Sequence, residues 1–319
     1  MARLGEDWLN RKILPMLSSS GRPFDSPKHL FDVKWDGIRM LAFVGPEKIR
    51  LQNRKLTEEA NRYPDLVEVL SQLPGEAVMD GEIVVFEKGK PSFERVLERE
   101  LASAPELIRT RSRTTPATYV AFDLLYRAGE DLLQTPLSRR KELLAEFLAG
   151  RTGGALIETP FVREKGREYY QRAAEQGLEG VVAKALASPY LPGKRTRHWI
   201  KAKVERLMDC IVLGTLVEPA TGRVRSLVLG AYREHRLVWM GNVGSGLDDR
   251  TLKALASELA PLAGEPPPGL SVVGAGEVRW LKPALVARVK FLETTGQGRL
   301  RAPVFQGFVD RHPETCTAQ

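Results

Sequence analysis

The chain has 319 residues, a mass of 35.5 kDa and a formal net charge of +8, from 48 lysines and arginines against 40 aspartates and glutamates. With 43% hydrophobic and 28% charged residues, its composition is globular and excludes a mainly disordered chain. Two cysteines and four scattered histidines exclude a disulfide framework or a zinc cage, and no apolar run reaches the roughly 18–20 residues of a membrane span.

The first two-thirds of the chain alternates strand-like and helix-like segments. Runs rich in Val, Ile and aromatic residues, bounded by turn residues, predict strands over 31–33, 40–44, 48–52, 77–85, 118–125 and 179–184. Apolar residues at helical spacing predict helices over 65–73, 138–148 and 168–176. This alternation predicts a mixed α/β domain over residues 1–203.

After Lys203 the pattern becomes that of a β-meander. The predicted strands are 209–216, 224–232, 236–243, 278–281 and 285–293, with one helix over 248–259. This density of short strands over 204–319 favours a small β-barrel of the oligonucleotide-binding type (OB fold), although another small barrel fits the same periodicity. The predicted fold class is therefore α+β.

Lys34-Trp35-Asp36-Gly37-Ile38-Arg39 lies between two predicted strands. Gly37 permits a tight turn, which would place the Lys34 amine and the Arg39 guanidinium around one phosphate. A charged hairpin loop explains the same residues, and this motif alone favours the loop by about two to one.

Two motifs sit on strands and carry an acidic or an aromatic side chain. In Asp80-Gly81-Glu82-Ile83-Val84, a carboxylate at a strand end is either solvated or an acceptor for a sugar hydroxyl or a hydrated metal. In Tyr119-Val120-Ala121-Phe122-Asp123, the phenylalanine is either a core residue, which is the commoner fate, or a stacking platform for a base.

The last two motifs combine an acid with several lysines. Glu179 and Lys184 close the two ends of an apolar strand, and Lys201 and Lys203 follow at spacing i, i+2. In a strand that spacing points both ammonium groups to one face, where an anion would relieve their repulsion. Two snorkelling lysines on a solvated edge strand explain the pattern about equally well.

In their order, KWDGIR, DGEIV, AFDLL, EGVVAK and WIKAK resemble the nucleotidyltransferase motifs of ATP-dependent DNA ligases. Further matches, including Gly241–Gly246 and Gly298–Gly307, point to the type found in bacterial non-homologous end joining. The resemblance implies a nucleotidyltransferase (adenylation) domain over 1–203 and an OB-fold domain over 204–319. It also implies a ligase that seals 5′-phosphate/3′-OH nicks or ends through a lysyl-AMP intermediate and a DNA-adenylate.

The resemblance implies that four residues are catalytic and bind ATP. Lys34 is the nucleophile that takes AMP from ATP, and Lys201 and Lys203 hold the α-phosphate. Arg39 contacts the nucleotide or the nick phosphate, and Arg54 does the same without a catalytic role.

Five further residues are implied to bind the nucleotide or its metal. Glu82 binds the ribose and, with Glu179, holds Mg²⁺ or Mn²⁺. Phe122 stacks on adenine, and Lys184 faces the phosphate or the nick. Asp32 stands where these ligases usually carry a glutamate that accepts a hydrogen bond from adenine. Because the aspartate side chain is shorter, its backbone must lie closer to the base.

The C-terminus departs from the family pattern. Val309 occupies the position of an arginine that orients the pyrophosphate, and the next basic groups are Arg311 and His312, with Arg301 nearby. The sequence leaves open whether these residues substitute or whether self-adenylylation is slow.

From the resemblance we expect a monomer, cytoplasmic and associated with the nucleoid, acting in double-strand break repair with no membrane. Its partners would be nicked or broken double-stranded DNA, a Ku-like end-binding protein and a separate end-processing polymerase. We expect no DNA-clamping domain before the two domains, so that DNA is held by Lys and Arg contacts to phosphates. The alternatives are an RNA ligase or a capping guanylyltransferase and, in a different class, a non-catalytic nucleic-acid-binding module.

Overall fold

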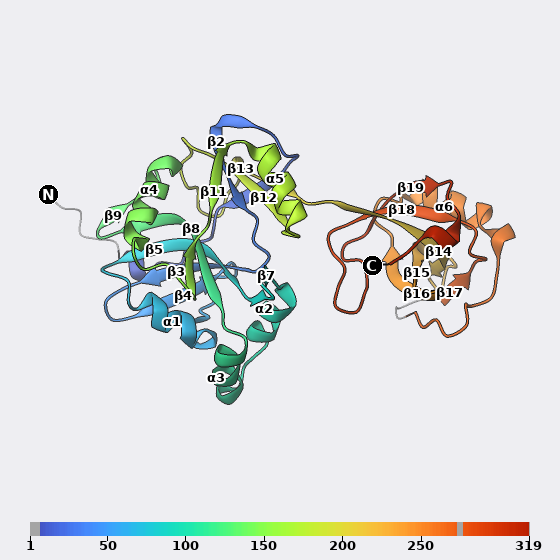
Figure 1. The fold of residues 1–319 in the computed structure, drawn as a ribbon, viewed down its shortest axis with the longest axis horizontal. Helices are drawn as coiled ribbons and strands as arrows, with labels where there is room; N and C mark the ends of the chain where they lie inside the picture. Colours follow the sequence, from blue (N-terminus) through green and yellow to red (C-terminus); the bar gives the residue numbers. More distant parts are fainter. Residues whose placement is uncertain (1–6, 273–276, 319) are drawn as a thin grey trace. The chain divides into compact units, whose positions relative to one another are not determined.

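The structure of this protein is a computed structural model that describes residues 7–272 and 277–318 (Figure 1). The chain divides into two compact units, one ending at Val204 and the other beginning at Glu205. Over the described residues, no helix is long and apolar enough to cross a membrane.

Among the described residues, the first unit contains two large β-sheets and a two-stranded one. In spatial order, sheet one contains β1 (Leu17–Ser20), β13 (Arg195–Lys203), β12 (Gly180–Ala185), β2 (Ser26–Val33) and β11 (Phe161–Glu164). Sheet two contains β10 (Leu156–Glu158), β8 (Thr118–Arg127), β5 (Ala77–Val84), β3 (Ile38–Val44) and β4 (Ile49–Asn53), with β9 (Glu130–Asp131) beside β8. The predicted strands of this unit are confirmed.

In the described part of this unit, five α-helices accompany the sheets. They are α1 (Pro64–Leu70), α2 (Phe93–Glu100), α3 (Pro105–Thr114), α4 (Leu137–Leu148) and α5 (Gly166–Glu175). The short hairpin of β6 (Phe86–Glu87) and β7 (Lys90–Pro91) precedes α2, and the 3₁₀ turns are η1 (Trp8–Asn10) and η2 (Ala60–Arg62). The three predicted helices are confirmed, although α1 ends three residues early; α4 packs on β8 and α5 on β12 (Figure 1).

Sheet two is buried on both of its faces. Because side chains alternate along a strand, Met40 and Ala42 of β3 join one core cluster, together with Leu66 of α1. Leu41 and Phe43 join the other, which also contains Phe122 of β8 and Trp199 of β13. The second cluster therefore joins the two sheets and forms the base of the space between them.

The second unit is a mostly antiparallel β-sheet domain. Its strands, in spatial order, are β16 (Arg236–Val243), β15 (Val224–Arg233), β14 (Arg206–Val217), β18 (Val286–Phe291) and β19 (Val304–Val309), with β17 (Glu277–Trp280) also paired to β14. Its other elements are α6 (Asp249–Glu258), η3 (Ala260–Leu262) and η4 (Pro313–Thr315). The predicted meander and helix are confirmed, but strand pairing among the described residues does not close a barrel, so the OB fold stays a prediction.

Candidate functional site

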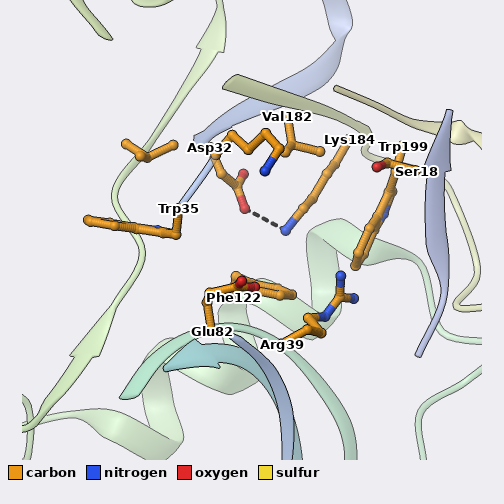
Figure 2. Close-up of a pocket in the computed structure, with 11 residues that line it drawn as sticks. Ser18, Asp32, Trp35, Arg39, Glu82, Phe122, Val182, Lys184 and Trp199 are labelled. Atoms are coloured by element: carbon orange, nitrogen blue, oxygen red, sulfur yellow. Dashed lines mark hydrogen bonds and ion pairs between the residues drawn. The ribbon is translucent and has the colours of Figure 1, made fainter. Parts of the chain in front are cut away.

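A pocket opens between the two sheets of the first unit (Figure 2). Sheet one contributes Asp32 of β2, Val182 and Lys184 of β12 and Trp199 of β13, and sheet two contributes Arg39 of β3, Glu82 of β5 and Phe122 of β8. Ser18, Val33, Lys34 and Trp35 complete the lining. Figure 2 shows Asp32 and Lys184 on one side of this space, facing Phe122 and Glu82 on the other.

Strand pairing places Lys34 at the pocket. Lys34 follows directly after β2, and its backbone N–H donates to the Gly180 carbonyl at 2.9 Å, where β12 begins. Gly37 lies at a bend just before β3, where a Cβ atom would lie 2.2 Å from the carbonyl oxygen of Ile83. Only glycine fits this close approach of the backbone to β5.

Glu179 binds two of the lysines expected at the site. The Lys34 ammonium donates to Glu179 Oε2, and Lys203 Nζ lies 2.7 Å from Glu179 Oε1. Burial disfavours the charged carboxylate, but Lys34 and Lys203 outweigh this and lower the pKa of Glu179. Burial, and then the charges of Lys203 and Lys34, lower the pKa of Lys201. These four residues form one charged group in which an anion would relieve the repulsion among the lysines.

Asp32 and Lys184 form a buried ion pair on the wall of the pocket. Lys184 Nζ donates to Asp32 Oδ2 at 2.5 Å, and the two side chains are 3% and 2% exposed (Figure 2). Burial raises the pKa of Asp32 and lowers that of Lys184. The second oxygen, Asp32 Oδ1, is buried and has no hydrogen-bond partner among the described residues. A buried acceptor of this kind is costly unless a ligand donates to it.

Phe122 forms the opposite side of the pocket. Lys184 Nζ lies 4.2 Å from the centroid of its ring and Arg39 Cζ lies 4.7 Å from it, both within cation–π range. The indole of Trp199 meets this ring edge-on at 6.1 Å between centroids. Phe122 is 7% exposed and lines the pocket, so it belongs both to the core and to the site.

These observations fit a nucleotide. The unpaired Asp32 Oδ1 matches the exocyclic amine of a base, the Lys184 ammonium matches a ring nitrogen beside it, and Phe122 offers an aromatic ring. The lysines around Glu179 supply positive charge for phosphates.

Comparisons with known proteins decide the family. Residues 15–203 match the model of the ATP dependent DNA ligase domain, and residues 220–310 match that of the ATP dependent DNA ligase C terminal region. DNA ligase C1 of Mycolicibacterium smegmatis is 31% identical, over 90% of this chain and 86% of that protein. This chain belongs to the ATP-dependent DNA ligase family.

Multifunctional end-joining proteins are also similar to this chain. The non-homologous end joining protein LigD of Pseudomonas aeruginosa is 32% identical over 94% of this chain, and the chain spans 36% of that protein's length. The solved structure of a mycobacterial DNA ligase D complexed with ATP and MES is 32% identical, with a TM-score of 0.56, over 98% of this chain and all of the other.

Arg39 is fixed by two residues that the sequence did not assign to the site. Its guanidinium donates from Nε and Nη2 to the two carboxylate oxygens of Asp80, both at 2.5 Å, and the Tyr190 hydroxyl donates to Asp80 Oδ2 at 2.6 Å. Burial disfavours the Arg39 charge, but Asp80 outweighs it and raises the pKa of Arg39. Asp80 is fully buried in this network. The motif DGEIV contained the signal for Asp80, and Tyr190 lies in Ser188–Gly193, a further stretch that resembles the family but to which no role was assigned.

Of two further residues predicted for the site, one lines the pocket and the other does not. Glu82 lines the pocket, and burial raises its pKa to about 7. Arg54 lies in the exposed turn after β4 and is not part of the pocket lining. Trp35 was missed as a lining residue although it lies inside the first motif; its indole N–H donates to Thr159 Oγ1 at 2.8 Å.

The basic residues of the C-terminal segment have partners within the second unit. Arg311 Nη1 donates to Asp209 Oδ2 at 2.9 Å and its Nε donates to Thr315 Oγ1 at 2.8 Å. His312 Nδ1 lies 3.8 Å from Glu314, and Arg301 donates to Glu293. Val309, at the position of the family's arginine, ends β19.

Proposed function

We propose that this chain seals 5′-phosphate/3′-OH breaks in DNA and that Lys34 carries the AMP. In the first step the Lys34 Nζ–phosphorus bond forms at the α-phosphate of ATP, the bond from that phosphorus to the bridging oxygen breaks, and pyrophosphate leaves. The observation that supports this best is the convergence of Lys34, Lys203 and Glu179 beside a pocket with an unpaired buried acceptor. Positioning and charge neutralisation govern such phosphoryl transfers.

Each charged residue has a role in this proposal. Lys201 and Lys203 bind the α-phosphate, while Glu179 holds the Lys34 amine beside it. As an ammonium ion Lys34 cannot attack, so it must lose a proton before the bond forms. Arg39, fixed by Asp80, presents its charge near the ring of Phe122, where a nucleotide would lie.

The carboxylates of Glu179 and Glu82 are the proposed metal ligands. Mg²⁺ binds one or two protein carboxylates together with substrate phosphates and waters, so two acids suffice. The described residues hold no cluster of three metal-binding side chains, which agrees with a site completed by ATP. When bound, Mg²⁺ or Mn²⁺ would neutralise phosphate charge.

Adenine is the base that fits the proposal. Its exocyclic amine is a donor for Asp32 Oδ1, and its N1 is an acceptor for Lys184. Guanine presents the opposite pattern at these positions, a carbonyl and an N–H. ATP rather than GTP is therefore the proposed substrate.

Labelled nucleotides test this function. The protein is incubated with α-labelled ATP and Mg²⁺, and an acid-labile, base-stable adduct is expected that is lost in Lys34→Ala. Lys48→Ala is the matched control, because Lys48 is an exposed lysine outside the pocket. Intact-mass measurement detects AMP already present on the purified protein. If the wild type neither carries nor forms an adduct, the proposal is wrong.

The nucleic-acid substrate requires a second stage. Adenylylated protein is chased with nicked DNA and, separately, nicked RNA, and AMP is expected on the DNA 5′-phosphate before sealing. Sealing of the RNA alone, or labelling with GTP alone, would favour an RNA ligase or a capping guanylyltransferase. Binding of DNA without any adduct would favour a non-catalytic module.

We further propose a role in end joining with a Ku-like end-binding protein and an end-processing polymerase. The support is the similarity to relatives named as end-joining proteins. The test compares joining of linear DNA ends with and without the Ku-like protein. No stimulation would contradict this part of the proposal and leave nick sealing intact.

A further inference from the structure

A buried lysine lies behind the nucleotide pocket and has no role so far. Lys141 extends from α4, and its side chain is 4% exposed. Its ammonium nitrogen is 2.8 Å from Glu158 Oε1 and 4.9 Å from the centroid of the Phe161 ring. The contact with Glu158 is an ion pair without hydrogen-bond alignment, so Lys141 Nζ has no hydrogen-bond partner among the described residues.

Strand register places the Lys141 ammonium on the same face of sheet one as the Asp32 side chain. Phe161 of β11 is directly opposite Asp32 of β2 in the antiparallel pair. Directly opposite residues point their side chains to the same face, with Cβ atoms about 5 Å apart. Because Lys141 lies over the Phe161 ring, it is on the face from which the Asp32 carboxylate extends. Two buried polar atoms without hydrogen-bond partners, Lys141 Nζ and Asp32 Oδ1, thus share one region.

We propose that Lys141 is a positioning residue for the nucleotide. Its buried positive charge keeps Asp32 ionised, so that the free Oδ1 accepts a hydrogen bond from the exocyclic amine of adenine. This inference rests on the proposed function. It gives α4 a role in base recognition although Lys141 does not line the pocket.

The charges around Asp32 explain why a second cation is needed. Burial raises the pKa of Asp32; Lys184 and then Lys141 act against it, while Asp123 of β8 adds to it. Burial and then the charge of Asp32 raise the pKa of Tyr169 of α5, so this nearby hydroxyl is neutral. When the Lys184 ammonium donates to adenine N1, its bond to Asp32 is shared. The charge of Lys141 then remains to hold the carboxylate ionised.

Substitution of Glu158 tests the proposal, because it should shift the ionisation of Asp32 in the direction opposite to substitution of Lys141. Its carboxylate partly neutralises Lys141, so removing the lysine charge and removing the glutamate charge shift Asp32 in opposite directions. Lys141→Met raises the pH at which Asp32 loses its charge, and Glu158→Gln lowers it. A packing defect at the same contact would instead weaken ATP binding in both variants.

The experiment measures ATP affinity by calorimetry from pH 5.5 to pH 8, in EDTA so that no adenylylation occurs. For Lys141→Met we expect affinity about tenfold below wild type at pH 5.5, with a difference of less than about twofold at pH 8. Glu158→Gln is expected to bind more tightly than wild type at pH 5.5. The ionisation of ATP itself is common to all variants and cancels in the comparison.

Arg139→Met is the matched control. It removes a positive charge from the neighbouring residue of α4, whose side chain is 52% exposed, and the pH profile is expected to stay at wild type. Lys141→Arg retains the charge and is expected to restore the wild-type profile.

The inference is overturned if Lys141→Met follows the same profile as Arg139→Met, or if it shifts in the same direction as Glu158→Gln. If Lys141→Met does not fold, a wild-type profile for Glu158→Gln overturns it. Wild-type protein that binds no ATP refutes the proposed function and this inference with it.

Discussion

Replacing Asp80 with asparagine removes the charge that holds Arg39. Asp80 is fully buried, and the Arg39 side chain is 23% exposed beneath the rings of Phe122 and Trp199. Asparagine keeps the shape of the side chain but leaves the guanidinium in a poorly solvated position without its hydrogen-bonded counter-charge. The variant therefore tests the ion pair with little change in packing.

The expected loss of stability follows from the burial of this pair. Removing one partner of a buried ion pair costs about 3–5 kcal/mol, and the partial exposure of Arg39 favours the lower end. For a unit of about 200 residues, about 3 kcal/mol lowers the melting temperature by about 6–12 °C. Tyr190→Phe removes the hydrogen bond to the same carboxylate and the one that the hydroxyl accepts from the Met16 N–H, and should cost about 2–3 kcal/mol.

Calorimetric melting of the wild type, Asp80→Asn, Arg39→Met and the double variant measures these terms. The double variant should lose less than the sum of the single losses, with a coupling of about 2 kcal/mol, because methionine needs no counter-charge. Self-adenylylation, assayed well below the transition, should be slower in Asp80→Asn because Arg39 loses its fixed position. A melting temperature within about 2 °C of wild type would refute the assignment of Asp80 as the support of Arg39.

Three further outcomes are expected. Burial raises the pKa of Glu82 from 4.5 to about 7, so the free energy of unfolding should fall as the pH rises between these two values. Glu82→Gln should remove this decline, which is measured by comparing urea midpoints at pH 4.5 and pH 8. Gly180→Ala should destabilise the fold by at least about 1–3 kcal/mol and slow self-adenylylation, since φ is +143° and a Cβ atom would lie 2.1 Å from the Ala202 oxygen. Gly75→Ala, with φ +71° but open space, measures the backbone strain alone, and should cost about 1–2 kcal/mol without slowing self-adenylylation. DNA affinity should fall with salt with a log–log slope steeper than about −3, and a slope near zero would contradict binding through phosphate contacts.

The sequence predicted the long, buried strands and most of the helices because their side chains are buried in regular patterns. It did not predict β1, β10, β11 and β19, whose side chains are mostly half-buried or exposed. Helices α2 and α3 were not predicted, since α3 buries no side chain and α2 buries only Val96 and Arg99. Local signals did exist, because Ser92 caps α2 and Pro105 begins α3. The spacing of Phe93, Val96 and Leu97 was also a helical signal for α2 that was missed, whereas α3 has no apolar stripe.

Contacts between side chains that are far apart in the sequence could not be predicted. The partners Asp32 and Lys184 are separated by 152 positions. Each was assigned to the site through its motif, but nothing in the order of residues indicated that they bind each other or that Asp32 keeps a free oxygen. Tyr190 and Lys141 lie outside the five ligase motifs and act through partners on other elements, so only the packed structure identifies them.

The convergence of Lys34, Glu179 and Lys203 follows from strand register rather than from the motifs separately. Lys34 comes directly after β2, Glu179 directly before β12, and Lys203 pairs with Gly180 across β12 and β13. Because side chains alternate along a strand, a slip of one residue between these strands would turn Lys203 away from Glu179. The Lys34 N–H to Gly180 carbonyl bond and the Val204 N–H to Glu179 carbonyl bond, 2.9 Å and 2.8 Å long, oppose such a slip from both sides. The backbone therefore sets the positions of the charges that the proposed first step requires.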